Sequence, residues 1–228
     1  MSKSVVPASS ASVPAPAVPT AAAPLEGAAS PAREAVPVVP DYQLSVIAQP
    51  PGPEHTFHSR EEEITDYFCG EDAYRDATQH VARTWSVWHG ADLLGCFAIQ
   101  TDAVRLDGRE RPESIPYLWA PAVKIARFGV NEAVARRKIQ LTDARRADDP
   151  DEPDVVSVGE YMLLYVIGLA KTLSEQIAVR YLTLDALPRE GLLTWYENYG
   201  FERTNVPVID YDGATQAAEV NMLFDLHG

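Results

Sequence analysis

A long apolar helix between two strand-like segments is the feature that most restricts the fold of this chain. Residues 158–173 carry apolar side chains over most of a helical circumference, which predicts a central, covered helix. The segment 123–130 before it alternates in hydropathy and predicts a strand, and 181–186 after it is also predicted to be a strand. Such a strand–helix–strand unit places both strands in a sheet with the helix packed on its face.

Strand and helix signals continue on both sides of this unit. The runs 82–88 and 93–104 predict a hairpin, because their connection contains Gly90. Ser59 is expected to cap the first helix, with Glu62 three residues later. The other predicted elements are strands at 42–48, from 201 onward and at 220–226, and helices at 71–80 and 189–199. This order predicts a mixed α/β fold with a mostly antiparallel sheet of six or seven strands and helices on both faces.

The first 40 residues differ in composition from the rest of the chain. They hold eight of the 18 prolines and eleven alanines, and no aromatic residue occurs before Tyr42. A segment with so little to bury cannot offset its ordering entropy, so residues 1–40 are predicted to be a disordered tail. Residues 41–228 then form one domain, and a chain that begins at Asp41 is expected to keep its melting temperature.

The charge of the domain narrows the choice of partners. The formal net charge of the chain is −14, and all of it falls outside the first 40 residues. Phosphate backbones and anionic membranes bind basic surfaces, so this composition argues against nucleic acid and lipid as partners. Residues 131–156 hold five basic and seven acidic residues and few apolar ones. They are predicted to be a charged loop insertion.

No sequence signal predicts export, a membrane span or a metal site. The most apolar run, 161–170, has ten residues, and a membrane-spanning helix needs about 20. Met1–Val6 lacks the apolar stretch of a secretory signal. Cys69 and Cys96 are interpreted as reduced core thiols of a cytoplasmic protein. The two histidines nearest the first helix have no second ligand pair beside them.

Four segments, taken in chain order, form a pattern that is typical of a known enzyme family. They are the strand 123–130, the helix start 157–160, the strand 181–186 and the aromatic run Trp195–Phe201. In this order they resemble the GNAT superfamily of acyl-CoA-dependent N-acetyltransferases, whose late motif is an aromatic residue followed by Tyr-x-x-x-Gly-Phe. The resemblance covers about residues 42–206.

The N-terminal half resembles one branch of that superfamily. Phe57–Ile64 stands where the branch that includes toxin–antitoxin toxins has Phe-Asp-Cys-Gly followed by a short helix. Ala82–Trp85 opens the next strand much as in that branch. The resemblance implies a GNAT-like fold, acetyl-CoA as co-substrate and an antitoxin-like protein as a partner.

The resemblance also implies how the co-substrate is held. The strand that ends at Val130 should splay from its neighbour, with acetyl-CoA in the gap. Backbone groups of Phe128, Gly129 and Val130 would hold the pantetheine and polarise the thioester carbonyl, as an oxyanion hole does. The pyrophosphate would bind at the helix N-terminus, where free N–H groups favour anions; the residues there are Ser157, Val158, Gly159 and Glu160.

Tyr196 is the residue that the resemblance makes the general acid. Its hydroxyl has an ordinary pKa near ~10, which matches that of the departing thiolate it would protonate. Tyr199 is expected to have no such role. Asp185 ends a strand and either orients or deprotonates the amine, or caps the helix that begins near Arg189. No residue is assigned as the general base.

The chain departs from the family pattern at the helix start. Compared with the family pattern, roughly 19 additional residues lie between the preceding strand and this helix start. Ser157 stands where the family has a Gly, and Tyr161 stands where it has a small residue. Ser157 and Glu160 also form a capping-box pattern, which puts a carboxylate where the phosphate would bind. Five basic residues of the insertion either supply the missing positive charge or belong to a solvated loop: Arg136, Arg137, Lys138, Arg145 and Arg146.

These observations lead to one hypothesis and one alternative. The hypothesis is an acyl-CoA-dependent N-acetyltransferase that acetylates a primary amine by direct attack in a ternary complex. The net charge of −14 favours a cationic small molecule or peptide as the acceptor over aminoacyl-tRNA. The alternative is a GNAT-like domain that does not bind the cofactor and serves as a protein-interaction module.

Overall fold

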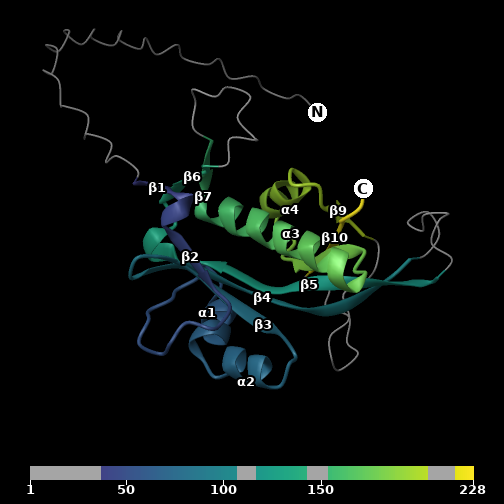
Figure 1. Ribbon diagram of the computed structural model, residues 1–228, viewed down its shortest axis with the longest axis horizontal. Coiled ribbons are helices and arrows are strands. Elements are labelled where there is room, and N and C mark those ends of the chain that lie inside the picture. The colour runs from purple at the N-terminus through teal and green to yellow at the C-terminus, as the bar shows by residue number, and fades with distance from the viewer. Residues whose placement is uncertain (1–36, 107–116, 143–153, 205–218) are drawn as a thin grey trace, which may run out of the picture. The chain divides into compact units, whose positions relative to one another are not determined.

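Seven strands form the main sheet, in the order β2-β3-β4-β5-β8-β10-β9 (Figure 1). The computed structural model describes residues 37–106, 117–142, 154–204 and 219–228. The strands are β2 Leu44–Ile47, β3 Arg83–His89, β4 Asp92–Arg105, β5 Trp119–Val130, β8 Tyr181–Ala186, β9 Glu202–Arg203 and β10 Val220–Asp225. All neighbouring strands are antiparallel except β5 and β8, which are parallel. The predicted mixed, mostly antiparallel sheet is confirmed.

Helices cover both faces of this sheet. α1 (Glu62–Cys69) and α2 (Asp72–Thr78) lie on one face, and α3 (Val158–Ile177) and α4 (Glu190–Glu197) lie on the other (Figure 1). We call these the α1 face and the α3 face. Residues from alternate positions along each strand reach opposite faces, so each face has its own group of buried side chains.

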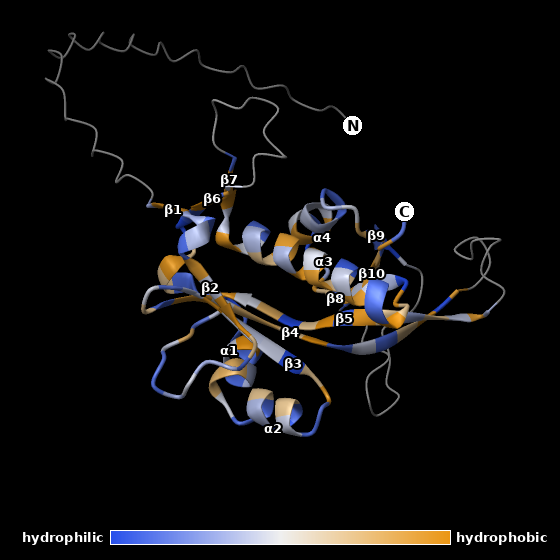
Figure 2. Ribbon diagram, in the orientation of Figure 1, coloured by the Kyte–Doolittle hydropathy of each residue, from blue (hydrophilic) through white to orange (hydrophobic). Residues whose placement is uncertain are grey.

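The main core lies between α3 and the sheet. Hydrophobic residues run along the strands and recur along α3 (Figure 2). Met162, Leu163 and Val166 are buried there against strand residues such as Phe97 and Leu182. A second, smaller core lies under α1 and α2 and contains Phe57, Phe68, Cys96 and Ala98. The helix at 158–177 is therefore central, as its sequence predicts, and it runs four residues beyond the predicted end.

A second sheet of three short strands corrects two of the predicted boundaries. β1 (Val38–Pro40) pairs in parallel with β6 (Lys138–Gln140), which pairs antiparallel with β7 (Val155–Ser157). The predicted tail of residues 1–40 therefore extends too far, since residues 38–40 form a strand. The insertion 131–156 is likewise not a loop throughout, because β6 and β7 pair within it. Residues 1–36 of the predicted tail and residues 143–153 of the predicted insertion lie outside the described residues.

Removal of β1 is expected to destabilise the protein. Val39 is 7% exposed and belongs to the main core, and burial of a valine side chain contributes about 1.5–3 kcal/mol. A chain that begins at Asp41 should therefore melt at least ~3 °C below one that begins at Pro37. Thermal unfolding of the two chains by circular dichroism measures this difference, and equal melting temperatures would show that β1 contributes nothing.

The first helix also begins later than the sequence predicts. Glu61 is its N-cap residue and makes no side-chain cap hydrogen bond. Its carboxylate instead accepts two hydrogen bonds from Arg189, at 2.5 and 3.0 Å. The predicted cap, Ser59, lies outside the helix, and its N–H donates to Thr65 Oγ1 at 2.9 Å. The predicted capping by Ser59 is therefore wrong, and the helix begins without a side-chain cap.

Candidate functional site

The two strands at the centre of the predicted site separate part-way along their length. β5 and β8 pair over four residues each, and the last pair is Ile125 with Leu184. Beyond that pair, β8 continues to Ala186 beside β10, and β5 continues to Val130 beside β4. We call this separation the strand split. It lies where the strand ending at Val130 is predicted to splay.

A β-bulge in β5 marks the start of the split. Ala126 has no partner in β4, because Arg127 lies opposite Ala98 and Ile125 lies opposite Ile99. A bulge bends a strand and increases its local twist. The bulge therefore gives a local reason for β5 to leave β8 immediately after Ile125.

Phe128 and Val130 direct their backbone groups into the split. The next residue, Asn131, donates its N–H to the Leu94 carbonyl of β4 at 2.9 Å. Backbone groups alternate between the two edges of a strand. Those of Phe128 and Val130 therefore point away from β4, toward the edge where β8 is no longer paired. Within the described part of the chain, they are available as donors and acceptors for a bound group.

Gly129 has a different position from the one predicted. By the same alternation its backbone groups point to β4, so it does not line the split. Its lack of a side chain serves packing, because a Cβ there would lie 2.6 Å from Ile64 Cγ2 and 3.0 Å from Phe57 Cζ. Gly129 thus lets α1 and the segment before it lie directly on β5.

The start of α3 lies beside the end of β5. A Cβ on Gly159 would be 3.5 Å from Val130 Cγ2. Ser157 is the N-cap residue, and its Oγ accepts from the Glu160 N–H at 3.2 Å. Val158 is 1% exposed, so its side chain is part of the core and only its backbone is available. The helix start and the strand split are therefore adjacent, as the resemblance requires.

Glu160 places a negative charge at this helix start. Its carboxylate accepts from the Ser157 N–H at 2.5 Å, which completes the predicted capping box. Burial alone would raise the pKa of Glu160, but the hydrogen bonds from Ser157 and Tyr199 and the charge of Lys138 outweigh burial and lower it. The carboxylate is therefore ionised at neutral pH and occupies part of the positive potential that a phosphate would use.

The insertion brings one basic residue to the same place. Lys138 of β6 lies opposite Ser157 of β7, and its charge helps to lower the pKa of Glu160. Arg137 is engaged elsewhere, with Asp92 Oδ2 2.9 Å from its guanidinium. Arg136 is exposed, and the predicted pair Arg145 and Arg146 lies outside the described residues. Of the five candidate basic residues, the described structure places Lys138 at the helix start.

Tyr196 lies inside the core of the α3 face. It is 8% exposed, and its ring packs edge-on against Trp195 and Phe201 at centroid distances of 4.8 and 5.6 Å. Burial raises the pKa of Tyr196 to about 12. Its hydroxyl forms no hydrogen bond with another described residue. The side chain is therefore a protonated phenol that is held by apolar packing, and its raised pKa makes it a weaker acid than the ordinary phenol expected from the sequence.

Tyr199 has a role that the sequence did not predict. Its hydroxyl donates to Glu160 Oε1 at 2.8 Å, which ties the end of α4 to the start of α3. Tyr199 is therefore unsuitable as an inert control for Tyr196. The sequence contains no local signal for this contact, because the two residues are 39 positions apart.

Asp185 forms a polar cluster on the α1 face. One carboxylate oxygen, Oδ2, forms an ion pair with Lys124 of β5, and the other accepts from Asn221 Nδ2 of β10 at 2.8 Å. Asp185 does not cap the next helix, whose N-cap is Arg189 with no side-chain cap bond. Of the two interpretations of Asp185, helix capping is wrong. Its position next to the strand split fits an orienting role.

An acidic pocket of about 360 Å³ lies on the same face, along α1. Its lining consists of Glu62, Glu63, Asp66, Tyr67, Asp72 and Arg127. Glu63 forms an ion pair with Arg127 at 3.4 Å, and Asp72 one with Arg75 at 2.7 Å. Four carboxylates and one guanidinium give this pocket a negative potential. It is complementary to a cation.

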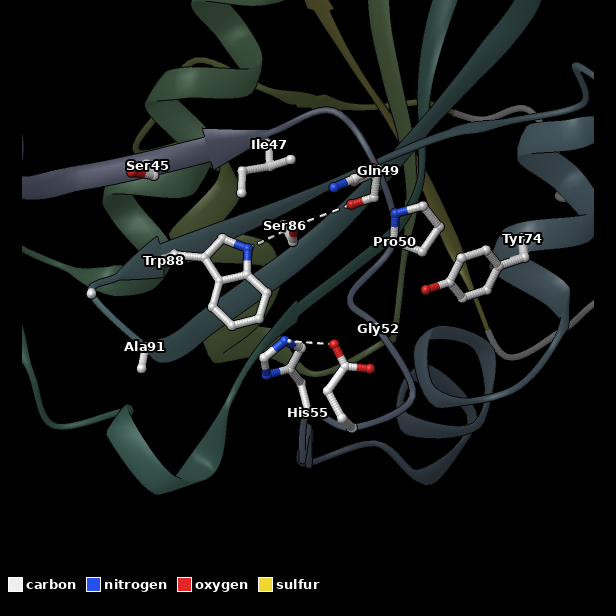
Figure 3. Close-up of a pocket in the computed structure, with 12 residues that line it drawn as sticks. Ser45, Ile47, Gln49, Pro50, Gly52, His55, Tyr74, Ser86, Trp88 and Ala91 are labelled. Atoms are coloured by element: carbon white, nitrogen blue, oxygen red, sulfur yellow. Dashed lines mark hydrogen bonds and ion pairs between the residues drawn. The ribbon is translucent and has the colours of Figure 1, made fainter.

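A further pocket of about 450 Å³ lies near the β2 edge of the sheet, beside β2 and β3 (Figure 3). The rings of His55 and Trp88 meet edge-on there at 4.5 Å, and Tyr74 donates to the Pro51 carbonyl at 2.7 Å. The pocket contains none of the site residues predicted from the sequence. The strand split lies at the other side of β4, so the two places are separate.

The described residues also address the expectations for the two cysteines, for a metal site and for a membrane-spanning helix. Cys69 and Cys96 are both free, but only Cys96 is buried, so the expectation of two core thiols is wrong for Cys69. Burial raises the pKa of the Cys96 thiol. Within the described part of the chain, no three ligand-type side chains are arranged to hold a metal. No described helix has the length and apolar character to cross a bilayer.

Comparisons with known proteins identify the fold. No protein-family model and no curated protein matches the chain. Among solved structures, AtaT complexed with acetyl-methionyl-tRNAfMet matches with a TM-score of 0.56 and 14% identity, over 80% of this chain and 94% of that one. The chain has the GNAT fold. A mutant of KacT matches with a TM-score of 0.55 and 16% identity, over 81% and 95% of the two chains. A structure described as a bacterial toxin has a TM-score of 0.56 and 13% identity, over 80% and 91%.

Proposed function

We propose that this protein is an acyl-CoA-dependent N-acetyltransferase that acetylates a primary amine by direct attack in a ternary complex. The observation that carries the proposal is the strand split, which opens beside the start of α3 in a GNAT fold. Structures with this fold include AtaTR bound with acetyl-CoA. That neighbour supports acetyl-CoA as the co-substrate here.

The residues around the split account for the steps of such a transfer. Acetyl-CoA supplies an activated acetyl thioester, and the open backbone N–H groups at Phe128 and Val130 stabilise negative charge on its carbonyl oxygen. The start of α3, with Lys138 beside it, receives the pyrophosphate. Tyr196 donates its hydroxyl proton to the departing thiolate.

The acceptor is a cationic amine in this proposal. The acidic pocket along α1 lies on the face of the sheet opposite α3, so donor and acceptor approach the split from different sides. AtaT is solved with acetyl-methionyl-tRNAfMet, but a net charge of −14 and this pocket suit a polyamine or a lysine-rich peptide better. A mutant of AtaT is also solved with the C-terminus of the antitoxin AtaR, which supports an antitoxin-like partner for this chain.

One observation favours a second function. The Glu160 carboxylate occupies the helix start that a pyrophosphate would use. If this charge prevents binding, the domain is a protein-interaction module with a GNAT fold. Direct titration of the protein with acetyl-CoA by calorimetry separates the two, because only the enzyme binds it.

Glu160→Gln is expected to tighten the binding of acetyl-CoA by roughly 2- to 5-fold, the size of one charge at a helix end. Glutamine retains the capping-box hydrogen bonds but removes the negative charge. Glu175→Gln, near the other end of α3, is the matched control and should leave the affinity unchanged. Unchanged affinity in Glu160→Gln would show that the carboxylate does not compete with the phosphate. No binding by either protein would support the interaction module.

A further inference from the structure

The side chains at the split differ between the two faces of the sheet. On β5 and β8, Ile125 and Leu184 belong to the core of the α3 face. Their neighbours along each strand, Lys124 and Asp185, therefore point to the α1 face, where the acceptor approaches. On β10, Met222 belongs to the α3 core, so Asn221 also points to the α1 face. The acceptor side of the split is thus polar.

Most carboxylates at this place are fully engaged. Asp185 has a side chain that is 10% exposed, and both of its oxygens have partners, Lys124 and Asn221. Asp102 accepts from Thr183 Oγ1 at 2.6 Å and from the Ala103 N–H at 2.8 Å. Both oxygens of each of these two carboxylates therefore already have partners, and neither presents a free oxygen to an incoming amine.

Glu219 differs from these carboxylates. It directly precedes β10, whose first residue, Val220, pairs with Ala186 at the end of β8. It is half-buried and forms no ion pair or hydrogen bond with another described residue. Its carboxylate is therefore held beside the split without a partner among the described residues.

The charges around Glu219 come from three elements. Burial raises its pKa most, and the like charges of Asp185 on β8 and Glu63 on α1 raise it further. The positive charges of Lys124 and Arg127 on β5 oppose this shift without cancelling it. A carboxyl group with a raised pKa accepts a proton more readily than an ordinary one.

We propose that Glu219 is the general base of the transfer, and that the Lys124–Asp185–Asn221 cluster positions the acceptor amine beside it. This inference rests on the proposed acetyltransferase function. It names the proton acceptor that the sequence left unassigned. Lys124 and Asn221 hold the Asp185 carboxylate in place, so that Asp185 attracts the ammonium group while Glu219 takes its proton.

The protons and bonds of the reaction balance. Glu219 takes one proton from the ammonium group, and the amine nitrogen then forms a bond with the thioester carbonyl carbon. The carbon–sulfur bond breaks, and the thiolate takes the Tyr196 proton. The new amide nitrogen loses its second proton, which restores the Tyr196 hydroxyl. Glu219 releases its own proton to water, so the products are the acetylated amine, free coenzyme A and one proton.

Glu219→Gln tests this assignment in the full chain, with acetyl-CoA and spermidine as substrates and release of the coenzyme A thiol as the signal. The expected result is a fall of kcat/KM by about 100-fold or more at neutral pH. The affinity for acetyl-CoA and the melting temperature should be unchanged. The acidic limb of the pH–rate profile should disappear, because it reports the ionisation of the base. Glu219→Asp should retain that limb at a reduced rate.

Glu202→Gln on the neighbouring strand β9 is the matched control, since Glu202 is exposed and away from the split. It should keep the wild-type rate and profile. A wild-type protein that acetylates spermidine, together with a Glu219→Gln protein of equal rate and equal pH profile, would overturn the role of Glu219 alone. A wild-type protein that binds no acetyl-CoA and releases no thiol would overturn the acetyltransferase function, and this inference with it.

Discussion

Tyr196→Phe is expected to lower turnover by about 100-fold or more, while the protein remains folded and still binds acetyl-CoA. The substitution removes one oxygen and keeps the ring, which packs against Trp195 and Phe201. Because the hydroxyl has no hydrogen bond to another described residue, its loss should cost little stability. The general acid is then the one function removed, and such a loss is worth 10²- to 10⁴-fold in rate. Steady-state kinetics at saturating substrates measures it.

The control for this experiment is a different buried tyrosine. Tyr181 is 3% exposed, lies on β8, and pairs with Ala122, three residues before the split begins. Tyr181→Phe should therefore leave turnover nearly intact. Tyr199→Phe is not a control, because it would release Glu160 and alter the helix start. If Tyr196→Phe and the wild type turn over equally at saturating substrate, Tyr196 is a packing residue and another group protonates the thiolate.

The main sheet was predictable because its signals are local. The alternation in β5, the Gly-containing turn between β3 and β4, and the apolar circumference of α3 each lie within one segment of sequence. The capping box of Ser157 and Glu160 belongs to the same class, since its two partners are three residues apart. Such patterns need no knowledge of the rest of the chain.

The small sheet was not predictable for the opposite reason. β1 and β6 lie 100 residues apart in the chain, and Val38 pairs with Lys138. Three-residue strands are too short to show a period, and β1 follows a segment rich in proline and alanine. Composition alone therefore assigned β1 to the tail and β6 to the charged loop.

The residues of the candidate site also fall into two groups, those that local motifs predict and those that depend on contacts between distant segments. Phe128, Val130 and the start of α3 came from motifs and lie together in the structure. Glu219 and the bond between Tyr199 and Glu160 were missed, because they depend on distant elements meeting. One signal in the sequence could have drawn attention to Glu219: it is an acidic residue immediately before an apolar strand at the end of the domain.

Gly95→Ala is expected to be strongly destabilising. Gly95 lies in β4, where a Cβ would contact the Met162 sulfur on α3 and would lie 2.7 Å from the Gly129 carbonyl oxygen. The methionine can move, but the carbonyl belongs to the β4–β5 ladder and cannot move without disturbing it. Forced overpacking of this kind costs about 1–3 kcal/mol, and backbone involvement puts this site at the upper end. A fall in melting temperature of about 5–10 °C should follow.

Gly168→Ala is expected to stabilise the protein slightly, in contrast to Gly95→Ala. Gly168 lies within α3, and a Cβ there would meet no atom within 4 Å. Alanine is more favourable than glycine in a helix interior by about 0.5–1 kcal/mol, so this variant should melt at a slightly higher temperature than the wild type.

The Gly95→Ala variant also tests the site, because Gly95 pairs with Val130 and sets how closely α3 approaches β4 and β5. If α3 is displaced in Gly95→Ala, its N-terminus moves from the split, and acetyl-CoA should bind more weakly at temperatures where the variant is still folded. Wild-type stability in Gly95→Ala would mean that α3 does not approach the sheet this closely, and that its start is not held over Val130.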